Sequence, residues 1–182
     1  DSSLITFPGI MSGEVVIDAP SFLHGAEVNL NAMLWRDPHF RWEASIGARY
    51  LNLNEQLNIN AVSQVQLAPN FVGFGIPFDG NTIQVTDMFH TRNNFYGAQA
   101  GTRLEFDHRR WTLSMAGKVA LGVTHENVKI SGVTSINTQP AILEPAGLFA
   151  TATNSGRFTQ GAFAVVPEVN MTLKFQLTER LR

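Results

Sequence analysis

The sequence contains no cysteine and no long apolar run. Without cysteine the chain has no disulfides, thiolate zinc ligands or cysteine nucleophile. A membrane helix needs a run of about 18 or more apolar residues, and no such run exists. The 13 Lys and Arg residues nearly balance the 15 Asp and Glu residues, so no basic stripe for nucleic acid is present. No basic segment followed by an apolar core opens the chain, so a signal sequence for export, if one exists, was removed or lies upstream.

Motifs for catalysis are absent as well. The sequence has no nucleophile elbow, phosphate-cradling glycine loop or zinc motif. Asp87 with His90, and His125 with Glu126, are the only pairs that suggest metal or acid-base chemistry. Close neighbours on a strand often point to opposite faces, and Ser114 and His125 have opposite parity on one predicted strand. We therefore predict a protein that is not an enzyme and that holds no cofactor or metal.

What the sequence does contain is alternation with a period of two. Between Phe95 and Val123 the apolar side chains fall on one face of two successive segments, which flank the polar turn 107–110. This pattern predicts a β-hairpin. Each strand is about a dozen residues long, close to the roughly 9 to 11 residues that a tilted strand needs to cross a bilayer. Aromatic residues stand at the ends of the apolar faces: Tyr96, Phe106 and Trp111.

The same alternation recurs along the chain and predicts about five long antiparallel strands. A turn at Asp37-Pro38 separates the first two strands. The expected organisation is one β-barrel domain over 1–182. It comprises a loop region with a short strand at Glu14–Asp18 (1–21), a hairpin (22–50), a long loop with short strand candidates at Leu57–Ala61 and Ile83–Phe89 (54–94), a second hairpin (95–126), a second long loop (127–161) and the single strand of a truncated third hairpin (162–178). At Leu51 and Leu53 the apolar parity slips by one, which predicts a bulge or the exit of the strand from a bilayer.

Charge separates the two faces. Over the five strands the 33 apolar-face positions carry no Asp, Glu, Lys or Arg, whereas the 30 opposite positions carry eight. Lipid imposes such exclusion, because one Lys or Arg at the midplane costs roughly 2 to 4 kcal/mol. A soluble sandwich or lipocalin-like barrel also alternates, with its apolar face turned inward. The strand length, the terminal aromatics and the small residues opposite the apolar face favour an up-and-down transmembrane β-barrel.

The polar face supplies the candidate site. We predict that it lines the lumen through Glu27, Glu43, Arg49, Gln99, Arg103, Glu105, Lys118, Glu168 and Lys174. Two interpretations stay open: a pore lining for polar solutes, or cross-strand ion pairs that fill a closed interior. The segment 141–149 is unusually apolar for an external loop. It either packs under its own loop, folds into the barrel as a constriction or packs between subunits.

Several long motifs resemble one family. They are Phe89–Gln99 (FHTRNNFYGAQ), Ala152–Phe158 (ATNSGRF), Phe163–Val169 (FAVVPEV) and Ala48–Glu55 (ARYLNLNE). Together they resemble the putative β-barrel porin-7 family, outer-membrane proteins typical of planctomycete bacteria. The resemblance covers about residues 22–182 and implies an outer-membrane barrel without indicating a substrate.

These observations predict an outer-membrane β-barrel that acts as a porin-like passive channel for small polar solutes. The alternatives are a non-conducting barrel that displays its loops for adhesion or envelope structure, and a soluble lipocalin-like binder. The expected partners are the lipid bilayer, small polar solutes and further copies of the chain, without nucleic acid. Five strands leave open edges that hydrocarbon does not tolerate. We therefore expect either a fragment of a longer barrel or chains that complete one another.

Overall fold

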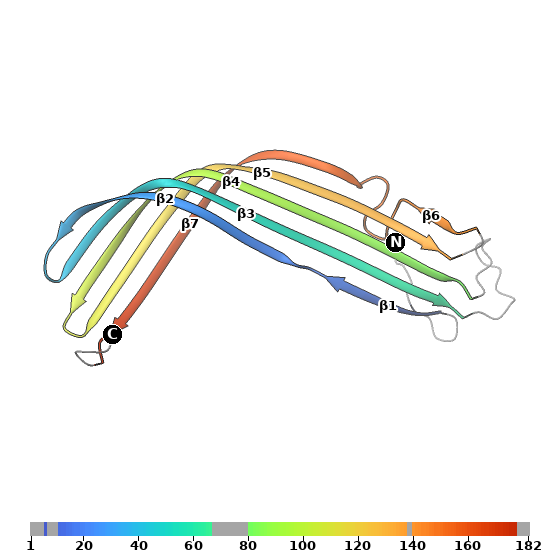
Figure 1. The fold of residues 1–182 in the computed structure, drawn as a ribbon, viewed down its shortest axis with the longest axis horizontal. Helices are drawn as coiled ribbons and strands as arrows, with labels where there is room; N and C mark the ends of the chain where they lie inside the picture. The colour runs from blue at the N-terminus through green and yellow to red at the C-terminus, as the bar shows by residue number, and fades with distance from the viewer. Residues whose placement is uncertain (1–5, 7–10, 67–79, 138–139, 178–182) are drawn as a thin grey trace. The chain divides into compact units, whose positions relative to one another are not determined.

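The computed structural model describes residue 6 and residues 11–66, 80–137 and 140–177. Over these residues the regular elements are strands, drawn in Figure 1. They are β1 (Met11–Asp18), β2 (Ser21–Arg36), β3 (Phe40–Val65), β4 (Thr82–His108), β5 (Trp111–Ile136), β6 (Ile142–Glu144) and β7 (Gly156–Phe175). The described residues include no helix that is long and apolar enough to span a membrane. The predicted all-β, antiparallel class is confirmed.

One path of hydrogen-bonded neighbours runs β1-β3-β4-β5-β6, while β2 also pairs with β3 and β7 also pairs with β5. β1 is antiparallel to the end of β3, from Met11 opposite Val65 to Asp18 opposite Asn58. The carbonyl of Pro20 then accepts a 3.0 Å hydrogen bond from the amide of Gln56, which continues the same register. β1 and β2 are therefore successive stretches along one edge of β3. The break at 19–20 contains a proline, which lacks an amide hydrogen and is tolerated at a sheet edge.

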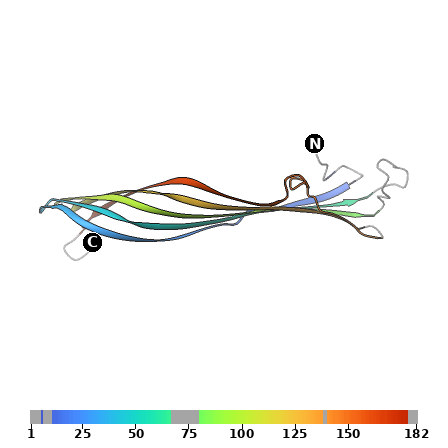
Figure 2. The same ribbon diagram turned by 90° about the horizontal axis from the view of Figure 1, so that it is seen from above.

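The chain forms two compact units. Unit 1 comprises Asp1–Phe22, Leu53–Arg92 and Glu126–Thr159, and unit 2 comprises Leu23–Asn52, Asn93–His125 and Gln160–Arg182. Within unit 2 the strand order is β2-β3-β4-β5-β7, and β2 and β7 are its edges (Figures 1 and 2). Over the described residues β2 and β7 are not paired with each other, so this sheet is open, as expected for part of a barrel.

Short turns join the strands of unit 2. β4 and β5 are separated only by Arg109 and Arg110, and Arg109 adopts a positive φ of 52°. Between β2 and β3 the Asp37 carboxylate accepts hydrogen bonds from the amides of His39 and Phe40, at 2.8 and 2.7 Å. A side chain that bonds to the backbone two or three residues later is typical of an Asx turn. The predicted turns, at Asp37-Pro38 and at 107–110, therefore lie where the sequence indicated.

The long loops expected at 54–94 and 127–161 are wrong in most of their length. β3 continues to Val65, β4 begins at Thr82, β5 continues to Ile136 and β7 begins at Gly156. In these stretches the alternation continues but changes sides. On β3 the apolar residues Leu57, Ile59 and Val65 have the parity of Glu43 and Arg49, and Asn54 and Asn58 have the parity of Ile46. The backbone hydrogen bonds nevertheless continue, as in the 3.0 Å bond from the Val65 amide to the Asn81 carbonyl. Residues 67–79 and 138–139 of the expected loops lie outside the described residues.

The expected slip at Leu51 and Leu53 involves no net insertion between β3 and β4. The amide of Asp107 bonds to the carbonyl of His39, and the amide of Val65 bonds to the carbonyl of Asn81. Between these two hydrogen bonds both strands contain the same number of residues, because His39 precedes Val65 by 26 residues and Asn81 precedes Asp107 by 26 residues. Neither strand therefore has an extra residue relative to the other. Instead the side-chain chemistry changes: from Asn52 onward polar residues occupy the face that was apolar. The bulge is therefore wrong for the β3–β4 pair, and the exit of the strand from a bilayer stays a prediction.

Unit 1 contains much of what is buried. Among the described residues of its strands Ala61, Ser63, Val65 and Asp87 are almost completely covered, and Asp87 has 1% of its surface exposed. β6 pairs antiparallel with the end of β5, from Ile142 opposite Ile136 to Glu144 opposite Thr134. The short strand expected at Glu14–Asp18 belongs to β1, which starts three residues earlier.

Candidate functional site

The two faces of the sheet in unit 2 differ in chemistry and in exposure. Large apolar side chains on one face are strongly exposed, for example Val28 (74%), Ile46 (64%) and Val169 (83%). On the other face Gln99 is 3% exposed and Ala120 is fully buried. A soluble sheet would show the reverse, with the large apolar side chains covered. The apolar face of unit 2 is thus the outward surface of this sheet.

Aromatic rings lie in a row across the apolar face where it ends. The ring centroids of His24 and Tyr50 are 6.3 Å apart, those of Tyr50 and Tyr96 are 5.1 Å apart, and those of Tyr96 and His125 are 6.2 Å apart. These four residues come from β2, β3, β4 and β5 in that order. The Tyr50 hydroxyl donates a 3.1 Å hydrogen bond to the side chain of Asn94. The row therefore combines apolar ring faces with polar edges.

A second group of rings lies near the turns. Phe40 and Phe106 are 4.9 Å apart, and Trp111 and Phe175 are 4.4 Å apart. The Trp42 indole donates a 2.8 Å hydrogen bond to the Thr102 hydroxyl. The residues between the two groups of rings are mostly aliphatic. Unit 2 thus presents an apolar band with aromatic side chains at both borders.

The polar face carries a network of ion pairs and hydrogen bonds. The Lys118 ammonium lies 2.6 Å from the Glu27 carboxylate and 3.5 Å from the Glu168 carboxylate. The Arg49 guanidinium pairs with Glu168 at 2.6 Å. The Gln99 amide donates to Glu27 at 3.0 Å. These five predicted residues therefore form one connected cluster, which we call the central network.

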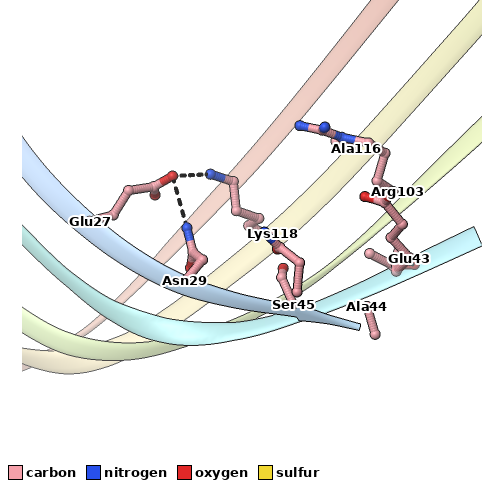
Figure 3. A pocket seen from close by; sticks show the side chains of 10 residues that line it. Glu27, Asn29, Glu43, Ala44, Ser45, Arg103, Ala116 and Lys118 are labelled. Carbon is pink, nitrogen blue, oxygen red and sulfur yellow. Dashed lines mark hydrogen bonds and ion pairs between the residues drawn. The ribbon is translucent and has the colours of Figure 1, made fainter. Parts of the chain in front are cut away.

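Asn29, which was not among the predicted lumen-lining residues, also joins the central network. Its side-chain amide donates to Glu27 at 3.1 Å, as Figure 3 shows, and its oxygen accepts from Gln99 at 2.6 Å. Its parity on β2 matches that of Glu27, so strand alternation alone could have placed it on the polar face.

The pairs of the central network require a concave polar face. Lys118 on β5 reaches Glu27 on β2, and Arg49 on β3 reaches Glu168 on β7. In each case the two strands are three positions apart in the sheet. Neighbouring strands lie about 4.8 Å apart, so three steps across a flat sheet would separate the backbones by about 14 Å. Side chains on a concave face converge, and direct contact then becomes possible.

Next to the central network the polar face contains a cavity of about 130 Å³. Its lining includes Glu43, Ser45, Arg103 and Lys118, which Figure 3 shows around the open space. A space of this size holds several water molecules. Glu43 and Arg103, both predicted for the lumen, therefore border a space that suits water or a small polar molecule.

The remaining predicted residues lie outside the central network. Glu105 pairs with Arg41 near the turns, and the same guanidinium lies 3.0 Å from Asp107. Asp107 was missed because it was assigned to a turn, and Arg41 because the strand was counted from Trp42, although both have the parity of the polar face. Lys174 is exposed and makes no ion pair with any other residue that the structure describes.

The candidate pairs for metal or acid-base chemistry are not assembled. The Asp87 carboxylate bonds to backbone amides of a distant segment, whereas the His90 ring nitrogen lies 2.7 Å from the Asn54 side chain. The His125 ring packs against Tyr96. Within the described ranges no group of three or more His, Asp or Glu residues could hold a metal ion.

The comparison with known families agrees with this geometry. The model of the family described as Putative beta barrel porin-7 matches residues 1–182. The chain belongs to this family. The match extends the resemblance noted in the sequence, which began at about residue 22, to the whole chain. No curated protein matches the chain. The family name suggests a β-barrel porin in an outer membrane and thus a protein that is not an enzyme.

Proposed function

We propose that this chain forms part of an outer-membrane β-barrel that conducts small polar solutes passively. The observation that carries the proposal is the pairing of an exposed apolar band with a concave, charged face in one sheet. The hydrocarbon of a bilayer favours contact with the apolar band and excludes the charged face. A bilayer around the apolar face and water along the polar face satisfy both.

The height of the apolar band supports a membrane location. Tyr96 and Phe106 stand at its two borders on β4 and are ten residues apart. At a rise of about 3.3 Å per residue and a strand tilt of about 35 to 45°, this distance corresponds to about 25 Å along the membrane normal. The outward apolar band of an outer-membrane barrel has this height. The alternative of a soluble binder would need Val28 and Leu173 in a dry core, yet they are 74% and 59% exposed.

The charges of the polar face support a weakly selective passage. The acids are Glu27, Glu43, Glu105, Asp107 and Glu168, and the bases are Arg41, Arg49, Arg103, Lys118 and Lys174. Equal numbers of both signs give no net field that favours one sign of ion. The solutes that fit best are therefore small, hydrated and polar, without a requirement for charge.

One observation favours a second candidate, a barrel that does not conduct and instead displays its loops. In the central network Lys118 and Arg49 bridge strands three positions apart, so side chains occupy part of the concave space. Barrels of about eight strands are filled by side chains in this way, whereas barrels of 16 to 18 strands leave an aqueous channel. The two candidates differ in whether water passes the central network.

Liposome swelling and planar bilayer recordings of the full-length protein separate the candidates. The channel predicts swelling in small sugars with a size limit, and nearly equal permeability to potassium and chloride. Lack of swelling with every solute, from protein that is correctly inserted, would reject the channel and favour the loop-displaying barrel. A strong preference for one sign of ion would contradict the balanced lining.

A further inference from the structure

The segment that follows β6 is fixed to unit 1 by a buried carboxylate. Asp87 on β4 accepts hydrogen bonds from the backbone amides of Leu148 at 3.0 Å, Phe149 at 3.2 Å and Ala150 at 2.7 Å. Asp87 is 1% exposed and Ala150 is fully buried. A buried carboxylate is unfavourable unless hydrogen bonds satisfy it, and three converging amides do so. We call Asp87 and residues 146–150 the loop latch.

Two glycines let the loop come this close. A Cβ on Gly147 would overlap the Asp87 carboxylate, and a Cβ on Gly132 of β5 would overlap Gly147 and the Ala150 carbonyl. The Thr134 hydroxyl adds a 2.7 Å hydrogen bond to the Ala146 carbonyl. The loop therefore lies directly on β4 and β5, with no room for a side chain between them.

The docked loop lies on the face of unit 1 that carries Asp87 on β4 and Gly132 on β5. Side chains alternate along a strand, so Asp87 has the same parity on β4 as Gln99, and Gly132 has the same parity on β5 as Lys118. The burial pattern of β4 keeps this alternation, since Asp87, Phe95 and Gln99 are all buried on one side. The contacts of residues 146–150 with β4 and β5 agree with two of the alternatives for the apolar segment 141–149, packing under its own loop and an inward constriction. Phe149 remains 53% exposed on the docked loop.

We propose that the loop latch holds residues 146–150 as an inward constriction of the passage along unit 1, with Asp87 as its positioning residue. This inference rests on the proposed channel function. The docked loop removes cross-section on the side of β4 and β5 that carries Asp87 and Gly132, and it exposes an apolar side chain, Phe149, on that side. Release of the latch should widen the passage.

The test compares two ways of releasing the loop with matched controls in the full-length protein. Asp87→Ala removes the carboxylate that accepts the three hydrogen bonds. Gly132→Ala keeps the carboxylate but adds a Cβ that would overlap Gly147 and the Ala150 carbonyl and so displaces the loop. Gly117→Ala is the control for the glycine change, because it lies on the same strand and a Cβ there meets no atom within 4 Å. Glu144→Gln is the control for the lost charge, since Glu144 is exposed beside the loop.

Two readouts are measured on each variant. Hydrogen exchange of the amides of residues 148–150 reports docking and does not depend on conduction. It should accelerate roughly ten- to a hundredfold in both release variants, the factor that corresponds to a lost hydrogen bond to a charged group. Single-channel conductance and the sugar size limit should rise in the same two variants and stay unchanged in both controls.

The outcomes distinguish the inference from the function on which it rests. Suppose that the wild type conducts and that the amides exchange faster in the two release variants. If conductance and sugar size limit are then the same in wild type and variants, the loop does not constrict the passage and the inference is wrong. Unchanged exchange in Asp87→Ala would also overturn it. If no variant conducts, the channel function fails together with the constriction. A wild type that conducts poorly and a release variant that conducts well would support the constriction.

Discussion

A positive charge in the middle of the apolar band should destabilise the inserted protein by an amount that depends on depth. Ile46 on β3 is 64% exposed and lies four residues from both Trp42 and Tyr50, which stand at the two borders. Four residues span about 13 Å along a strand, or about 10 Å along the normal for a tilted strand. Ile46 is therefore near the bilayer midplane if the apolar face contacts lipid.

The expected cost of Ile46→Arg is about 2 to 4 kcal/mol of unfolding free energy, since this is the penalty for Arg at the midplane of a barrel. Leu34→Arg is the matched control. Leu34 has a similar exposed fraction, 50%, but lies close to the turn, where Arg should cost only about 0 to 1 kcal/mol. Ile46→Ala separates the loss of contacts from the introduction of charge.

Guanidinium unfolding of the full-length protein from lipid vesicles, followed by tryptophan fluorescence, measures these differences. A clearly larger cost at Ile46 than at Leu34 supports lipid contact. If both arginines cost nothing, the face lies in water; if both cost the same several kcal/mol, it packs against protein. Either result would refute the assignment of this face to the bilayer.

Three further predictions concern the polar face, a turn and a close strand pair. Lys118→Gln should make the channel prefer cations in reversal-potential measurements, because it removes one base from a balanced face; Lys129→Gln, at the opposite parity of the same strand, should not. The backbone amide two residues after Asp37, and then a neighbouring indole, hold the pKa of Asp37 below its ordinary value of 3.8. The ionised carboxylate therefore stabilises the turn above pH 3.8, and this stabilisation is lost as the pH falls through the lowered pKa. The free energy of unfolding, measured between pH 6 and pH 2, should show this loss. The Asp37→Asn variant should lack this pH-dependent contribution. Gly47→Ala should destabilise the sheet by about 1 to 3 kcal/mol in denaturant unfolding, because the new Cβ would overlap β2, whereas Gly117→Ala should have little effect.

The sequence predicted the two faces of the sheet well because alternation is a local property. Val28, Ile46 and Val169 were assigned to the apolar face from parity alone, and all three are strongly exposed. Polar-face residues such as Glu27 and Lys118 were likewise assigned correctly to one side. Neither assignment required knowledge of which strands are neighbours.

The ends of the strands were predicted poorly, for a physical reason. Beyond Asn52 the apolar residues of β3 change to the opposite parity, with Leu57, Ile59 and Val65, and the strand continues to Val65 through backbone hydrogen bonds with its neighbours. Those bonds involve groups that every residue except proline possesses. A prediction that follows the apolar residues of one face therefore ends the strand where those residues change to the other face.

Contacts between segments that are distant in the chain could not be predicted from the sequence either. The pair of Lys118 with Glu27 depends on the curvature of four strands, and parity predicts only that both lie on one face. Asp87 meets a loop about 60 residues later in the chain, and nothing local indicates that its carboxylate binds three amides. Both features depend on tertiary structure.

The most direct test of the central claim measures what surrounds each face. Because the chain has no cysteine, single spin labels can be attached to Val28→Cys, Val119→Cys and Val169→Cys on the apolar face, and to Asn31→Cys and Ala116→Cys on the polar face. In lipid vesicles the first three labels should collide more often with oxygen, which partitions into lipid, and the other two with a water-soluble nickel complex. If the first three labels favour the nickel complex, or are shielded from both reagents, the apolar face does not contact the bilayer.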